Sequence, residues 1–160
     1  MSVGRAAPVL ALFVALTASP APALTLDDLA GRWRGEGALS LDDEPAQRLR
    51  CQIRFRTVDA TRSVFSGRCA TAQAARSFTY MLVLGPDDTL RAENRTEPQE
   101  EGLPTVMQGT LGSDGLRFAE GTARFDLSLT REGLDFRLEG DGPQGFARGQ
   151  ALLQRTGDAQ

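Results

Sequence analysis

The sequence predicts an all-β fold, a single up-and-down antiparallel β-barrel of eight to ten strands preceded by a short helical turn. From Arg48 onward, apolar and polar residues alternate with a period of two, as in half-buried strands. Clusters of Gly, Pro and Asp separate the alternating segments at the spacing of tight hairpins. Closing such a meander into a barrel removes its exposed strand edges, and an open sandwich is the structural alternative.

The first 23 residues have the three parts of a secretory signal peptide. Arg5 supplies the positive start, an apolar stretch runs from Ala6 to Ala18, and Ala21-Pro22-Ala23 forms an A-x-A cleavage site. The apolar stretch is too short to span a bilayer, which takes ~20 residues. We therefore expect residues 1–23 to be removed and the protein to reach the periplasm, or to be secreted, without a membrane span.

A short helical turn is expected over residues 25–31. Thr25 is positioned to cap it, and Asp28, three residues later, completes a capping box. The first strand should then run from Arg32 to Leu41, and residues 42–47 should form a loop.

Cys51 and Cys69 predict a disulfide, because an even cysteine count in an exported chain is typical of a bridge; two buried free thiols are the alternative. Pairing residues whose numbers sum to 120 places Cys51 opposite Cys69 and Phe55 opposite Phe65, around a three-residue loop at residues 59–61. Opposed residues in a non-hydrogen-bonded pair are close enough for such a bridge. The bridge and the apolar pattern therefore predict the same register.

Three later hairpins can be paired in the same way, by matching the two leucines that flank each tight turn. In the last of them one face is apolar and the other is polar throughout, as expected for a sheet with one wet side. The expected opposed pairs are Leu82 with Ala92, Gly109 with Phe118, Leu127 with Phe136, and Phe125 with Leu138.

The remaining segments complete the barrel domain, which we place at residues 24–155. Residues 97–104, rich in Pro and Glu, should form a loop. A final strand is expected from Phe146 to Arg155, and residues 156–160 should be a disordered, frayed tail.

The segment that ends in Gly31-Arg32-Trp33 resembles the opening of calycin barrels, the lipocalin and avidin group, in which a helical turn runs into Gly-x-Trp on the first strand. In lipocalins an Arg near the end of the last strand packs across that Trp and closes the bottom of the barrel. The resemblance implies a structural pair of Trp33 with Arg155, and Arg148 is the second choice. A guanidinium on an indole face contributes ~1 kcal/mol or more when shielded.

A looser resemblance links the chain to bacterial periplasmic inhibitors of secreted metalloproteases, which are small barrels of the same group. The shared features are export, an early Gly-x-Trp, and one disulfide across a hairpin whose first strand contains Cys-x-Ile-Arg, here Cys51-Gln52-Ile53-Arg54. Those inhibitors act through a segment before the helical turn, where cleavage after Ala23 leaves few residues. The resemblance implies a protein-interaction role.

The composition argues against catalysis. The chain has no His, and all 18 of its basic residues are Arg, which removes Ser-His, Cys-His and Schiff-base schemes. The acidic clusters at residues 42–44, 87–88 and 100–101 lie in expected loops, where carboxylates are solvated. Two cysteines without His also leave a metal site incomplete. We therefore expect no enzyme, no cofactor and no metal.

Basic charge is concentrated around the disulfide hairpin. Between Arg48 and Arg76 there are seven arginines and a single acid, Asp59, although the whole chain has a net charge of −3. That net charge argues against nucleic acid as a partner. The hairpin face opposite the cysteines should carry a basic ribbon able to bind an anion or a partner surface. Alternatively, these arginines form a solvated surface whose charge is balanced by acidic residues on neighbouring strands. The ribbon comprises Arg50, Arg54, Arg56 and Arg68.

Two functions remain. The first is a non-enzymatic barrel that binds a small apolar or amphipathic ligand in its open end. The alternative is a protein-interaction module, such as a periplasmic protease inhibitor, acting through loops or the basic ribbon. The two differ in whether the bulky inward side chains leave a cavity or fill the interior. That inward set is Leu49, Ile53, Phe55, Phe65, Phe125, Leu127, Phe136 and Leu138.

Overall fold

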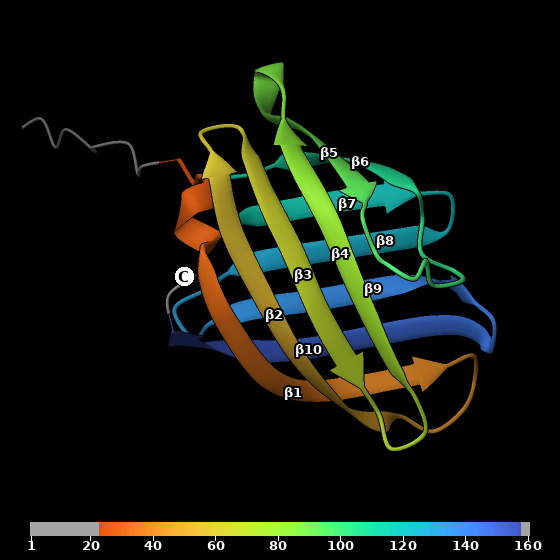
Figure 1. Ribbon diagram of the computed structural model, residues 1–160. Helices are drawn as coiled ribbons and strands as arrows, with labels where there is room; N and C mark the ends of the chain where they lie inside the picture. The colour runs from red at the N-terminus through yellow and green to blue at the C-terminus, as the bar shows by residue number, and fades with distance from the viewer. Residues whose placement is uncertain (1–22, 158–160) are drawn as a thin grey trace, which may run out of the picture.

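The computed structural model describes residues 23–157, which form a closed barrel of ten antiparallel strands (Figure 1). Each strand pairs with its neighbours in the sequence, and β1 pairs with β10 to complete the ring. The expected all-β, up-and-down barrel is therefore confirmed. The strands are β1 (Gly31–Leu41), β2 (Gln47–Asp59), β3 (Arg62–Ala70), β4 (Ala75–Leu84), β5 (Thr89–Asn94), β6 (Val106–Leu111), β7 (Gly115–Glu120), β8 (Ala123–Leu129), β9 (Leu134–Gly142) and β10 (Gly145–Gly157).

The two chain ends limit what can be compared with the sequence. The predicted signal peptide, residues 1–23, lies outside the described residues except for Ala23. Thr156 and Gly157, which the sequence assigns to a frayed tail, belong to β10, and the Thr156 hydroxyl donates to the Arg32 carbonyl at 3.3 Å. Residues 158–160 lie outside the described part.

The short 3-10 helix η1 (Leu26–Leu29) begins at the expected capping box. The Thr25 backbone N–H and hydroxyl both donate to Asp28 Oδ2, at 2.7 and 2.8 Å. Leu26 and Leu29 are buried in the barrel core, so η1 covers one end of the barrel (Figure 1). A second 3-10 turn, η2 (Pro86–Asp88), joins β4 to β5.

The disulfide hairpin has the expected register. Cys51 faces Cys69 and Phe55 faces Phe65. Its loop is shorter than expected, because the register shifts by one residue after Thr57 and leaves two residues between β2 and β3 instead of three. The Asp59 carboxylate accepts from the Thr61 backbone N–H at 3.0 Å and from Arg62 Nε at 2.7 Å, and these bonds hold the tighter turn.

The later hairpins also match their expected registers. The opposed pairs include Leu82 with Ala92, Gly109 with Phe118, Leu127 with Phe136, and Phe125 with Leu138. Turn chemistry and alternation are both local in the sequence, which is why these registers could be predicted.

Two glycines allow β1 to lie close against β10. A Cβ atom at Gly35 would collide with the Leu152 carbonyl oxygen, and one at Gly37 with the Gln150 carbonyl oxygen. Glycine at these positions lets the strand bend around the barrel, as Figure 1 shows for β1.

The two ends of the barrel differ. At the η1 end the interior is filled by side chains that are buried completely or nearly so, and the opposite end carries the connections that follow β1, β3, β5, β7 and β9 (Figure 1). The filled end is built from Leu29, Trp33, Phe55, Leu127, Leu134 and Leu153.

Candidate functional site

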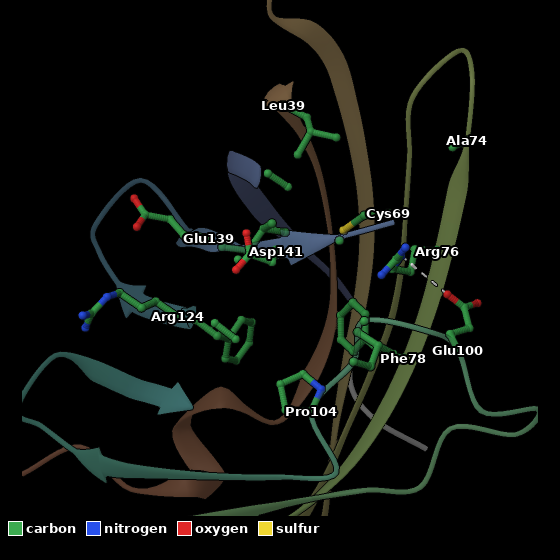
Figure 2. A pocket seen from close by; sticks show the side chains of 18 of the residues that line it. Leu39, Cys69, Ala74, Arg76, Phe78, Glu100, Pro104, Arg124, Glu139 and Asp141 are labelled. Carbon is green, nitrogen blue, oxygen red and sulfur yellow. Dashed lines mark ion pairs between the residues drawn. The ribbon is translucent and has the colours of Figure 1, made fainter. Parts of the chain in front are cut away.

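An apolar cavity of about 440 Å³ opens at the barrel end opposite η1 (Figure 2). Its walls come from both sides of the barrel and from the loops at the mouth. Of the expected inward set, Ile53, Phe55 and Leu127 pack outside this cavity, deeper in the barrel. The other five line it: Leu49, Phe65, Phe125, Phe136 and Leu138.

Phenylalanine rings form much of the cavity wall. The centroid of Phe65 lies 5.0 Å from that of Phe78 and 5.0 Å from that of Phe125. Phe125 in turn lies 5.4 Å from Phe136 and 6.0 Å from Phe118. These five rings, out of eight phenylalanines in the chain, all line the cavity and contact one another. The wall offers flat apolar faces and ring edges to whatever enters.

The segment between β5 and β6 folds against the mouth and is held there by Arg76. Arg76 Nη1 donates to the Glu101 carbonyl at 2.9 Å, and its Nε lies 3.8 Å from the Glu100 carboxylate, as the dashed line in Figure 2 shows. The same carboxylate accepts from the Ser77 backbone N–H at 3.1 Å. The acidic pair at residues 100–101 therefore has a structural position at the cavity mouth.

Tyr80 fixes the far end of the same segment. Its hydroxyl donates to the Pro104 carbonyl at 3.0 Å, and Leu103 and Pro104 line the cavity. Burial raises the pKa of Tyr80 to about 12, which keeps its hydroxyl a donor even in alkaline solution.

On the opposite side of the mouth, polar contacts tie the loops together. The Thr122 hydroxyl donates to Asp141 Oδ2 at 2.7 Å, and the Phe146 backbone N–H donates to Asp42 Oδ1 at 2.9 Å. Figure 2 shows Arg124, Glu139 and Asp141 at this edge of the cavity. The mouth is therefore polar around an apolar interior.

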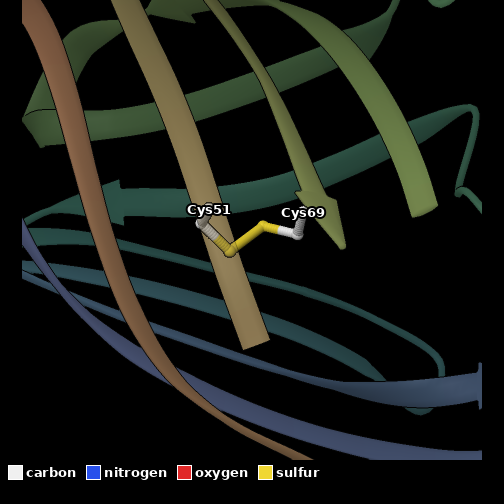
Figure 3. Close-up of a disulfide and its surroundings, with 2 residues drawn as sticks. All are labelled: Cys51 and Cys69. Carbon is white, nitrogen blue, oxygen red and sulfur yellow. A yellow bond between two sulfur atoms is a disulfide. The ribbon is translucent and has the colours of Figure 1, made fainter. Parts of the chain in front are cut away.

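The predicted disulfide is present (Figure 3), and its Cys69 end lines the cavity. Cys51 and Cys69 are joined by an S–S bond of 2.05 Å, with their Cα atoms 4.1 Å apart. Cys51 is fully buried, whereas Cys69 is 9% exposed and lines the cavity. The bridge thus connects the register of the hairpin to the shape of the cavity.

Trp33 and Arg155, the expected closure pair, lie at the other end. The Arg155 guanidinium carbon is 4.4 Å from the centroid of the Trp33 ring. Arg155 also donates to the carbonyls of Asp28, at 2.8 Å, and Ala30. The Trp33 indole N–H donates to the Leu29 carbonyl at 2.9 Å.

The four arginines of the predicted ribbon lie on the outer face of the barrel, away from the cavity. Arg50 lies 3.3 Å from the Glu36 carboxylate, and Arg54 is half-buried. Arg56 and Arg68 are exposed and form no ion pair with residues 23–157. Arg32 and Arg34 were not predicted to belong to this group, because they lie on β1, the strand before the disulfide hairpin.

Several cavity residues were also absent from the sequence-based set. Phe78, Tyr80, Met107 and Phe118 all line the cavity. The alternation in β4 and β7 contains the signal for the two phenylalanines. The loop at residues 97–104 gave less indication, because its composition is that of a solvated loop, yet it ends in the apolar pair Leu103-Pro104.

The described part of the chain has neither a cluster of metal-ligating side chains nor a membrane-spanning helix. Among residues 23–157, no group of three or more His, Cys, Asp or Glu side chains could hold a metal ion. No helix in the same range has the length and apolar character needed to cross a membrane.

No protein-family model matches this chain, and no curated protein matches it. A solved structure does: an S-type phycobiliprotein lyase, CPES, from Guillardia theta, with a TM-score of 0.59. The two chains are 12% identical, and the match covers 82% of this chain and 90% of that one. At this identity the likeness shows a shared barrel fold, consistent with the calycin-like resemblance.

This match corrects one expectation. The sequence predicts that the protein is not an enzyme, because it has no His or Lys and its acidic clusters lie in expected loops. A barrel of the same fold is named as a lyase, so that exclusion is wrong. The lack of His and Lys removes particular catalytic devices and leaves others open.

Proposed function

We propose that this protein binds a small apolar or amphipathic ligand in the open end of its barrel. The observation that carries the proposal is the cavity of about 440 Å³ walled by five phenylalanines. Ligand pockets of ~300–1,000 Å³ with mainly apolar walls and a few polar groups are the usual sites for small molecules. The likeness to the lyase structure supports only the barrel fold. The apolar and aromatic residues of the cavity wall support the class of ligand that we propose.

The cavity wall favours a ligand with a flat, unsaturated body. Aromatic side chains pack best with ring edges and faces of other π systems, in offset or edge-to-face arrangements. Phe65, Phe125 and Phe136 provide both orientations, with interplanar angles of 40° and 69° around Phe125. A polar group on the ligand would face the mouth, which is lined by Gln47, Gln73 and Gln144.

We further propose that the protein acts after export, in the periplasm or outside the cell. The features that support this are the signal-peptide pattern of residues 1–23 and the Cys51–Cys69 bridge. Disulfides of this kind persist in oxidising compartments.

A titration with 1-aminoanthracene, a flat apolar fluorophore, tests the binding proposal. Ala147 lines the cavity from β10, so Ala147→Trp should fill the space that the probe needs. Ala38→Trp is the matched control, because Ala38 is exposed on β1. We expect the wild type and Ala38→Trp to enhance probe fluorescence equally, and Ala147→Trp to bind about tenfold more weakly or not at all.

Circular dichroism of each variant checks that the barrel is intact. Equal probe affinity in Ala147→Trp and the wild type would contradict the proposal, as would the absence of saturable binding to the wild type.

A further inference from the structure

Five arginines project from the outer surface of three adjacent strands, β1, β2 and β3. We call this surface the arginine face. Their chain neighbours Trp33, Ile53, Phe55 and Cys69 are buried, so alternation directs the arginines outward. The arginine face comprises Arg32, Arg34, Arg54, Arg56 and Arg68.

The strand register brings these side chains together. Arg32 lies directly opposite Arg54, while Gln52 lies between Arg34 on one side and Arg68 on the other. Neighbouring strands are ~4.8 Å apart, and alternate residues along a strand are ~6.8 Å apart. The guanidinium groups therefore share one patch, and like charges directly opposite each other destabilise a strand pair.

Most other outward arginines on the described chain are balanced by a carboxylate. Arg48 and Arg50 meet Glu36, and Arg91 and Arg95 meet Glu93. By contrast, Arg32, Arg34, Arg56 and Arg68 have no ion-pair partner within residues 23–157. These four arginines carry positive charge that residues 23–157 leave unbalanced, and such a surface is matched in charge to an external anion.

The surroundings of the patch indicate what kind of anion. In the same rows, Arg54 faces Ser66, Ser66 faces Thr79, and Arg34 faces Gln154. These hydroxyl and amide groups can hydrogen-bond a polypeptide. Apolar groups border the face at one end only, where Val64 lies opposite Arg56 and the exposed Val58 follows on β2. Around Arg34 and Arg68 the facing residues are polar, so the centre of the face offers no apolar surface that would enter a lipid layer. They are Gln52, Gln154 and Ser77.

We propose that the arginine face docks an acidic, extended segment of a partner protein. Carboxylates on alternate residues of an extended chain repeat at ~6.8 Å, which is the spacing of Arg32 with Arg34 on β1. Each exposed guanidinium of the face can hold a carboxylate with two parallel N–H donors. These are the guanidinium groups of Arg32, Arg34, Arg56 and Arg68. This surface lies on the outside of the barrel, so the inference goes beyond ligand binding in the cavity and does not depend on it.

The test uses a fluorescein-labelled peptide of four Glu-Ser repeats and fluorescence anisotropy. Arg34→Gln/Arg68→Gln removes two charges from the face, and Arg117→Gln/Arg131→Gln removes two from exposed positions elsewhere. We expect the first double variant to bind the peptide about tenfold more weakly than the wild type, and the second to stay within about twofold. Binding by the wild type should weaken as salt rises from 50 to 300 mM.

Three results would overturn the proposal. The first is equal weakening in both double variants, which would make the effect one of net charge. The second is binding of phosphatidylglycerol vesicles in preference to the peptide, lost in Arg34→Gln/Arg68→Gln, which would assign the face to a membrane. The third is no saturable peptide binding by the wild type. The 1-aminoanthracene titration of both variants reports on the cavity separately, so failure of either proposal can be recognised.

Discussion

Arg155 stabilises the closed end of the barrel through two kinds of contact at once. Its guanidinium lies on the Trp33 ring, and it also donates to the carbonyls of Asp28 and Ala30. The contacts join the last strand to the first turn of the chain. The sequence could predict this pair only through the calycin resemblance, because nothing local links residues so far apart.

Arg155→Ala should therefore lower the free energy of unfolding by about 1–2 kcal/mol, through loss of the ring contact and of hydrogen bonds to two backbone carbonyls. Arg148→Ala is the matched control, since Arg148 lies 4.9 Å from the Phe146 ring at the open end and donates no such bond within residues 23–157. We expect Arg148→Ala to lower the free energy of unfolding by less than about 0.5 kcal/mol. Urea denaturation measures the free energy of unfolding of both variants, and equal losses would contradict a special role for Arg155.

Asp59 gives a second prediction at the scale of one residue. The Arg62 side chain and the Thr61 backbone N–H hold the pKa of this carboxyl at about 2, below its ordinary value of 3.8. Because the folded pKa is depressed, the stabilisation from this turn is present above the ordinary value and is lost as pH falls toward 2. An NMR titration of the Asp59 carboxyl should find the low pKa.

In Arg62→Gln the pKa of Asp59 should rise toward 3.8, whereas Arg91→Gln, which removes a partner of Glu93, should leave it unchanged. A wild-type Asp59 that titrates near its ordinary value would show that these turn contacts do not persist in solution.

At the scale of the element, the disulfide hairpin both sets a register and walls a cavity. The bridge spans 18 residues, and closing a loop of that length contributes about 3 kcal/mol in the chain-entropy model. Cys51→Ala/Cys69→Ala should lose roughly that much stability in urea denaturation. Its affinity for 1-aminoanthracene should also fall, because Cys69 lines the cavity.

A reductant should lower the stability of the wild type and leave the double alanine variant unaffected. If the unfolding midpoint were the same with and without the bridge, the hairpin register would have to be held by the strands alone.

Hairpins were the most predictable elements, since each depends on a turn and on alternation within about 20 residues. The register shift between Thr57 and Asp59 shows where prediction from turns and alternation fails. The shift between them arises from side-chain bonds of Asp59 to Thr61 and Arg62, which alternation does not encode. The segment between β5 and β6 was harder still, because its anchors to Arg76 and Tyr80 join residues 25 and 24 positions apart.

For the whole molecule, the sequence predicts the barrel but not how far its interior is filled. The eight residues of the expected inward set are all bulky, and only their positions around the barrel decide which of them contact one another. Phe55 packs into the closed end, whereas Phe125 and Phe136, whose ring centroids lie 5.4 Å apart on adjacent strands, line the cavity at the open end. The arginine face was predicted in part: Arg54, Arg56 and Arg68 came from one hairpin, and pairing of β1 with β2 added the other two.

The pairing of β1 with β10 also has a consequence for the order of folding. Arg155 bonds the Ala30 carbonyl across 125 positions, so the ring closes only after nearly the whole barrel has been synthesised. Until then β1 has one unpaired edge, and contacts so distant in the sequence form slowly. A barrel that closes last, at its C-terminal strand, therefore stays open until that strand is available to pair with β1.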